Sequence, residues 1–127
     1  DLAINPSKIM SSLCYSIFRL EPYTNCSFEC KYFYRDGTGV ERLATSKGVE
    51  DVFEGCKEVE SDIPFRLITL SEPLQDIEEN AKYSLKLMRI ALDYKIPIIL
   101  CTKSDRIAKE PWKSVINQLA EEGLIVV

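Results

Sequence analysis

Hydrophobic residues along the chain fall into short runs and longer periodic segments. Branched and aromatic residues are concentrated at residues 15–23 (YSIFRLEPY), 65–70 (FRLITL) and 96–102 (IPIILCT), a composition typical of β-strands. Residues 124–127 (LIVV) predict a fourth strand. The run at 96–102 is apolar almost throughout, so it predicts a strand that is buried on both faces, with Cys101 in the core.

Three longer segments carry hydrophobic residues at helical spacing. The first begins near Ser46, the second lies within residues 72–95 and the third runs from Pro111 to a stop at Gly123. Cys56 belongs to the apolar face of the first and is therefore predicted to be a core residue. The three faces consist of Val49, Val52, Phe53, Cys56 and Val59, then Ala81, Leu85, Met88 and Leu92, then Val115, Ile116, Leu119 and Ala120.

Strands and amphipathic helices alternate along the chain at intervals of roughly thirty residues, which predicts βαβ units and the α/β class. About four strands and three helices amount to half of a (β/α) barrel. We therefore expect a partial (β/α) barrel of parallel strands in a single domain, residues 1–127. A parallel strand at 124–127 with no helix after it leaves an edge exposed. We interpret the chain as a fragment, as a half-barrel completed by a partner chain or the remaining barrel half, or as a small open sheet.

The composition narrows the range of functions. The 127 residues carry a formal charge of −4, so the surface as a whole does not attract nucleic acid or an anionic membrane, and no apolar run could span a bilayer. Histidine is absent, which excludes Ser-His-Asp and Cys-His catalysis and the usual zinc sites built on histidine. Five cysteines in a spacing unlike a disulfide scaffold, without an export signal, predict reduced thiols and a cytoplasmic protein.

Chemistry in parallel α/β proteins gathers at the carboxyl ends of the strands. In this chain those ends carry Cys26 and Cys30, then SEP at residues 71–73 and TKSD at residues 102–105. The bare spacing of the two cysteines leaves three alternatives open: an iron–sulfur loop lacking one cysteine, a different metal site, or two ordinary free thiols. A cluster with one iron open to a substrate needs three thiolates from the protein, and this loop supplies two.

Three stretches coincide with these predicted strand ends: residues 21–35 (EPYTNCSFECKYFYR), 68–78 (ITLSEPLQDIE) and 99–105 (ILCTKSD). Together they resemble the radical S-adenosylmethionine superfamily, in the branch related to spore photoproduct lyase. The first is similar to the cluster loop NPYxGCxxxCxYCY, with Phe33 at the position of the third cysteine. The second is similar to VTDPYQPIE at the end of the family's second strand, and the third to ILTKS at the end of its third strand.

The resemblance implies a role for each matching residue. Cys26 and Cys30 would be ligands of a 4Fe-4S cluster, and Phe33 occupies the place of the third ligand. The second cofactor implied is S-adenosylmethionine. Its binding residues would be Tyr32 and Tyr34, which flank the cluster and the adenine, Ser71 near the methionyl or ribose part, and Lys103 paired with the carboxylate.

Two hypotheses for the function follow. In the first, the chain is a radical SAM-like iron–sulfur protein that cleaves S-adenosylmethionine reductively to a deoxyadenosyl radical, which acts on an unknown substrate. In the second, it is a degenerate non-catalytic module of that fold, acting as a binding or structural subunit. Phe33 has no lone pair for iron and favours the second, whereas Cys26, Cys30, Ser71 and Lys103 favour the first. Nucleic acid enters as a partner only by family analogy.

Other groups of potential metal ligands are weaker candidates for a metal site. Residues 58–62 (EVESD) and 76–80 (DIEEN) contain enough acids for a calcium or magnesium site, but acids at a helix start normally cap the helix and stay solvated. Cys14 lies before the first predicted strand and Cys101 within the third. Nothing in the sequence places either sulfur where Phe33 stands.

Overall fold

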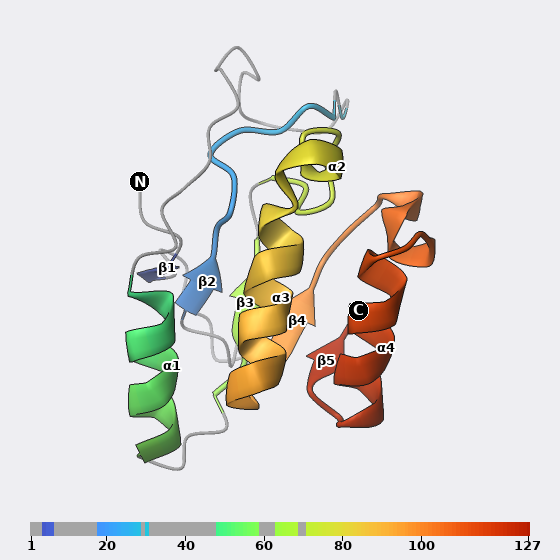
Figure 1. Ribbon diagram of the computed structural model, residues 1–127. Helices are drawn as coiled ribbons and strands as arrows, with labels where there is room; N and C mark the ends of the chain where they lie inside the picture. Colours follow the sequence, from blue (N-terminus) through green and yellow to red (C-terminus); the bar gives the residue numbers. More distant parts are fainter. Residues whose placement is uncertain (1–3, 7–17, 29, 31–47, 59–62, 69–70) are drawn as a thin grey trace.

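A sheet of five strands runs through the part of the chain that this computed structural model describes (Figure 1). β1 pairs antiparallel with β2, and every other neighbouring pair is parallel. The described residues are 4–6, 18–28, 30, 48–58, 63–68 and 71–127. The strands lie side by side in chain order: β1 (Ile4–Pro6), β2 (Phe18–Leu20), β3 (Phe65–Leu67), β4 (Ile98–Leu100) and β5 (Ile125–Val126).

The predicted α/β class is confirmed. The four predicted strands correspond to β2, β3, β4 and β5, and these form the parallel part of the sheet. Within the described residues the sheet is open and is not closed into a barrel. β1 is not among the predicted strands, because a three-residue segment that includes a proline gives no strand signal.

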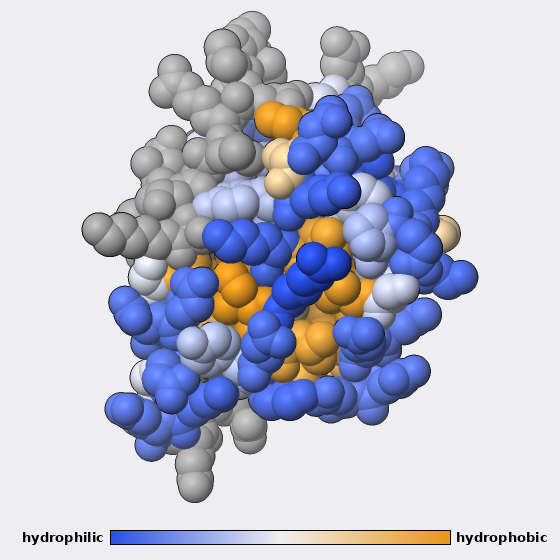
Figure 2. Space-filling view, in the orientation of Figure 1, coloured by the Kyte–Doolittle hydropathy of each residue, from blue (hydrophilic) through white to orange (hydrophobic). Residues whose placement is uncertain are grey.

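The long helices pack together on one face of the sheet, in front of the strands in Figure 1. Phe53, Met88 and Leu119 from three different helices enter the core that this packing encloses. Figure 2 shows hydrophilic residues over most of the helical surface, with hydrophobic surface visible between them. None of the described helices combines the length and the apolar character that crossing a bilayer requires. The helices are α1 (Val49–Glu58), α2 (Glu78–Ala81), α3 (Tyr83–Tyr94), the 3-10 helix η1 (Asp105–Ala108) and α4 (Trp112–Glu121).

The two faces of the sheet differ in chemistry, because successive strand residues point to opposite sides. Leu20, Leu67 and Leu100 are register partners across β2, β3 and β4, and all three belong to the core under the helices. The row one residue earlier therefore points to the face opposite the helices. It consists of Arg19, Arg66, Ile99 and Val126.

The burial predictions for Cys101 and Val52 are wrong. Cys101 is exposed rather than buried, because β4 ends at Leu100 and the next residue turns away from the core. Val52 is 40% exposed, since the buried face of α1 is narrower than its hydrophobic pattern suggests and is centred on Phe53. Cys56 is half-buried and packs against the core, so its predicted position holds in part.

The helix predicted within residues 72–95 is two helices. The chain breaks between α2 and α3 at Lys82, whose φ of +51° lies in the left-handed region. The backbone N–H groups of Ser84 and Leu85 donate to the carboxylate of Glu78, at 2.9 Å each, instead of to carbonyls one turn earlier. A side chain thus supplies the acceptors that start α3, which periodicity alone does not reveal.

The last helix and strand agree with the sequence pattern except at Ala120, which the pattern places on the buried face. In α4, Val115 and Leu119 are buried and Ile116 packs against the core, whereas Ala120 is exposed. Gly123 follows with φ +68°, a conformation that glycine adopts without strain and that commonly ends helices. The turn aims the chain back along the sheet, where β5 pairs with β4.

Candidate functional site

A buried carboxylate joins the loops that follow β3 and β4. Glu72 accepts hydrogen bonds from the backbone N–H of Leu74 at 3.0 Å, from the backbone N–H of Lys103 at 2.9 Å and from the hydroxyl of Thr102. The residue is 6% exposed. Because hydrogen bonds to a charged acceptor are stronger than neutral ones, Glu72 fixes the position of one loop relative to the other.

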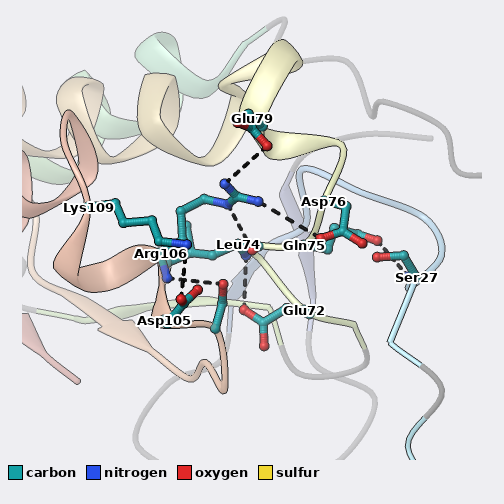
Figure 3. A network of polar contacts seen from close by, with 10 residues as sticks. Ser27, Glu72, Leu74, Gln75, Asp76, Glu79, Asp105, Arg106 and Lys109 are labelled. Atoms are coloured by element: carbon teal, nitrogen blue, oxygen red, sulfur yellow. Dashed lines mark hydrogen bonds and ion pairs between the residues drawn. The ribbon is translucent and has the colours of Figure 1, made fainter.

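A buried amide joins the cysteine loop to the loop after β3. The backbone N–H of Ser27 donates to Oε1 of Gln75, and Nε2 of Gln75 donates to the carbonyl of Asn25, both at 2.8 Å. Gln75 is fully buried, and Figure 3 shows Ser27 beside it. The two hydrogen bonds fix the backbone on each side of Cys26. The loop that carries the first cysteine is therefore held by the same segment that holds the loop after β4.

The carboxylate of Glu78 is fully buried and receives hydrogen bonds from four donors. Two are the backbone N–H groups of Ser84 and Leu85 at the start of α3. The others are the hydroxyl of Tyr23, after β2, and Nε1 of Trp112 at 2.8 Å, at the start of α4. Three segments that are distant in sequence thus converge on one carboxylate, whose charge is met by fixed dipoles.

Tyr23 is the neutral partner in this group. Burial raises the pKa of its phenol well above the ordinary value, and the hydrogen bond to Glu78 and the negative charge of Glu78 raise it further. The hydroxyl also accepts a hydrogen bond from the backbone N–H of Tyr83 at 3.4 Å. Tyr23 therefore stays protonated as a donor to Glu78 and anchors the chain just before the cysteines.

Arg106 lies beside the segment that connects β3 to α2 (Figure 3). Its Nε donates to the carbonyl of Leu74 at 3.4 Å, and its guanidinium stands 5.2 Å from the ring centre of Trp112. Nη2 lies 3.9 Å from Asp76, and Nη1 lies 3.8 Å from Glu79. Both acids are largely exposed, so the contacts that bury Arg106 contribute more than these ion pairs.

The strand ends bring together a thiol and an ammonium group. Sγ of Cys30, in the loop after β2, lies 3.7 Å from Nζ of Lys103, in the loop after β4. Cys30 is half-buried and Lys103 is exposed. A lysine ammonium on a long, flexible stem can hold a carboxylate as a point charge. This pair therefore lies at the accessible part of the edge, above the buried contacts of Glu72 and Gln75.

The structure describes some of the predicted site residues. Cys26 and Ser71 are half-buried, and Sγ of Cys30 lies 3.7 Å from Nζ of Lys103. In the described part of the chain, no hydrogen bond joins Ser71 to either member of that pair. The other positions singled out by the resemblance, Tyr32, Phe33 and Tyr34, lie outside the described ranges.

Sequence reasoning missed the residues that hold the loops. The acids at 76–80 are predicted to be solvated, and this is right for Asp76 and Glu79 but wrong for Glu78. Glu72 and Gln75 are likewise buried, although both are polar residues at the start of the predicted helical segment 72–95. The sequence does contain a signal for their burial, because both residues stand near proline and leucine directly after a strand. A segment that is buried there must form the hydrogen bonds of its backbone within the protein.

The residues present do not fit a cluster held by three thiolates. The loop offers Cys26 and Cys30, and phenylalanine at position 33 has no lone pair to give to iron. Among the residues that the structure describes, no group of three metal-ligating side chains gathers at any point. Cys101 is exposed, and Cys14 lies outside the described residues. Within the described residues, a cluster with one iron open to a cofactor therefore lacks one protein ligand.

Comparisons with known proteins found no match: no family model, no curated protein and no solved structure resembled the chain.

Proposed function

We propose that the chain is a degenerate radical SAM-type α/β module whose strand-end edge binds a cofactor of the S-adenosylmethionine class without catalysing radical chemistry. The observation that carries this proposal is the 3.7 Å approach of Lys103 to Cys30. It puts a cation at the end of β4 beside the cysteine loop, where the family resemblance calls for the partner of the cofactor carboxylate. Glu72 supports this position of Lys103, because its carboxylate accepts a hydrogen bond from the backbone N–H of Lys103.

The non-catalytic part of the proposal follows from the donor set. Two thiolates and a phenylalanine do not form the three-ligand site that leaves one iron open. Without a cluster, the edge can still bind a ligand through the Lys103 ammonium and through backbone and side-chain groups of the loops. In this proposal the protein works in the cytoplasm, where Cys26 and Cys30 stay reduced, and a partner chain or further strands cover the edge of β5.

A second candidate is the iron–sulfur enzyme itself, acting on an unknown substrate. It is favoured by one observation: both cysteines of the loop are free thiols, half-buried rather than enclosed in the core. In that case a ligand from outside the described residues would complete the cluster. The two candidates differ in whether iron is retained, so one set of experiments separates them.

The binding proposal is tested by isothermal titration of S-adenosylmethionine into the full chain under reducing conditions. We expect saturable binding to the wild type and at least about tenfold weaker binding to Lys103→Met, because the carboxylate loses its cation. Lys113→Met, which removes an exposed lysine from α4, is the matched control and should bind like the wild type. Equal affinities of the two variants, or no binding by any protein, would overturn the proposal.

The second candidate is tested by anaerobic reconstitution with iron and sulfide, followed by metal analysis. We expect the wild type to retain no iron after desalting and Phe33→Cys to retain it, since the variant supplies the third thiolate. Iron held by the wild type, lost in Cys30→Ser, together with reductive cleavage of S-adenosylmethionine, would establish the enzyme instead.

A further inference from the structure

The buried group around Glu78 pairs a phenol with a carboxylate. The hydroxyl of Tyr23 donates a hydrogen bond to Oε2 of Glu78, and the two residues are 2% and 0% exposed. The structure describes Tyr23, Tyr83 and Tyr94, and among these tyrosines Tyr23 is the one whose hydroxyl donates to a carboxylate. The pair therefore combines an oxidisable phenol with a base that is already placed to take its proton.

Loss of the proton alone is unfavourable at this position. Burial, the hydrogen bond to Glu78 and the charge of Glu78 raise the pKa of Tyr23, because a phenolate would add a second buried negative charge. Loss of the proton together with an electron has the opposite effect on the buried charge. The phenol becomes a neutral phenoxyl radical and the carboxylate a neutral acid, so the buried site loses its charge.

The hydrogen bonds of the pair persist after such a transfer. The new O–H group of Glu78 donates to the oxygen of Tyr23, which also accepts from the backbone N–H of Tyr83 at 3.4 Å. Oε1 of Glu78 keeps its two donors, the backbone N–H of Leu85 at 2.9 Å and Nε1 of Trp112 at 2.8 Å. Each of these groups has a partner in both states, and the proton moves along a hydrogen bond that already exists.

A sulfur that can act as the oxidant lies close to Tyr23 in the chain. Cys26 follows by three residues, so the two Cα atoms are at most about 11 Å apart. Cys26 is a half-buried free thiol, and Gln75 holds the backbone on each side of it. A thiyl radical, the one-electron oxidised form of a thiolate, oxidises phenols across such a distance. Tyr23 itself is buried, which shields a phenoxyl radical from molecules in solution.

We propose that Tyr23 is a redox-active tyrosine that reduces a thiyl radical at Cys26 while its proton passes to Glu78. One electron moves from the phenol to the sulfur, and the phenolic O–H bond breaks as an O–H bond forms on Oε2 of Glu78. The products are the Cys26 thiolate, the Tyr23 phenoxyl radical and protonated Glu78, with the negative charge transferred from Glu78 to the sulfur. Cys26 thereby returns to its reduced state. Neither the family resemblance nor Lys103 enters this step.

The thiyl radical can be generated directly in the full chain. Photolysis of the S-nitrosylated protein breaks the S–N bond homolytically, and electron paramagnetic resonance after rapid freezing identifies the residue that carries the radical. We expect the wild type to give a tyrosyl signal that narrows when ring-deuterated tyrosine is incorporated. Tyr23→Phe should reduce this signal at least about tenfold. Tyr94→Phe, which removes a half-buried phenol at the end of α3, is the matched control and should keep it.

A second pair of variants tests the oxidant. Cys26→Ser should reduce the tyrosyl signal at least about tenfold, because the radical no longer forms three residues from Tyr23. Cys101→Ser removes an exposed thiol after β4 and should leave the signal unchanged. Equal losses in the two serine variants would overturn the assignment of Cys26, and a full signal in Tyr23→Phe would overturn that of Tyr23.

The role of Glu78 is tested through the proton. Glu78→Gln removes the acceptor and should slow formation of the tyrosyl radical about 100-fold. In the wild type the radical should form more slowly in D₂O than in H₂O, because the proton moves with the electron. This measurement needs no variant, so it decides the question even where Glu78→Gln does not fold. The proposal fails if the wild type holds only a thiyl radical, or if its tyrosyl radical forms at the same rate in both solvents.

Discussion

Two parts of the strand-end edge differ in how their side chains are held. The fully buried carboxylate of Glu78 accepts hydrogen bonds from donors in α3, in α4 and in the segment after β2. A short way along the edge, Cys30 and an exposed Lys103 meet at 3.7 Å, longer than an ordinary hydrogen bond. The first arrangement positions the backbone of the loops, and the second presents chemical groups to whatever enters from solvent.

The difference predicts where substitutions cost stability and where they cost binding. A buried charge with all its donors in place is expensive to disturb, because each donor that loses its acceptor keeps its desolvation penalty. An exposed cation near a sulfur contributes little to folding, because water replaces the lost contact. The same edge should therefore separate into residues that support the fold and residues that serve a ligand.

Glu78→Ala should give the largest loss of stability. It leaves the donors of Tyr23 and Trp112 and two backbone N–H groups without their acceptor, so we expect the free energy of unfolding to fall by about 4 kcal/mol. Urea denaturation followed by the fluorescence of Trp112, the chain's one tryptophan, measures this directly. Glu78→Gln keeps one oxygen acceptor and should lose about half as much.

The matched control is Glu79→Ala, one residue further along α2. Its carboxyl is exposed and lies 3.8 Å from Arg106, so the loss should stay below about 0.5 kcal/mol. If both alanine variants lose the same amount of stability, the buried contacts of Glu78 do not hold the edge together.

Tyr23→Phe should have an intermediate effect that depends on pH. At neutral pH it removes a hydrogen bond to a buried charge, and we expect a loss of about 2 kcal/mol. Because the folded-state pKa of Tyr23 is raised, its contribution is complete below the unfolded value of about 10 and declines as pH rises above it. The stability difference between wild type and variant should therefore narrow above pH 10 by about 1.4 kcal/mol per pH unit.

Denaturation curves at several pH values between 7 and about 11 would measure this narrowing. Tyr94→Phe removes a phenol from the end of α3 and is the control for general alkaline effects, so it should leave the wild-type decline in place. A constant difference between wild type and Tyr23→Phe across the range would contradict the raised pKa.

Much of the fold follows from local sequence. Sequence alone predicts the apolar runs around β3 and β4, the buried face of α4 and the end of that helix at Gly123. Each of these features depends on residues within a few positions of one another. The break between α2 and α3 at Lys82 cannot be predicted from local sequence. It depends on Glu78, whose position is set by Tyr23 and Trp112, residues that become neighbours only when the sheet forms.

The site divides in the same way. Cys26, Cys30 and Lys103 can be placed at strand ends from sequence, since strand ends gather at one edge of a parallel sheet. The contact between Cys30 and Lys103 agrees with that placement. The buried roles of Glu72 and Gln75 could not be foreseen, because a polar residue in a loop segment is normally solvated and its partners here lie on other loops.

Lys103→Met and Cys30→Ser should have the smallest effects on stability. Each removes one member of a 3.7 Å contact at an accessible position, and each variant should unfold within about 0.5 kcal/mol of the wild type. The double variant completes a cycle whose coupling energy should also stay below about 0.5 kcal/mol, measured by the same urea denaturation. A coupling of about 2 kcal/mol would show that this pair holds the fold as Glu78 does. In that case the exposed half of the edge is structural too, and the lysine cannot be assigned to a ligand.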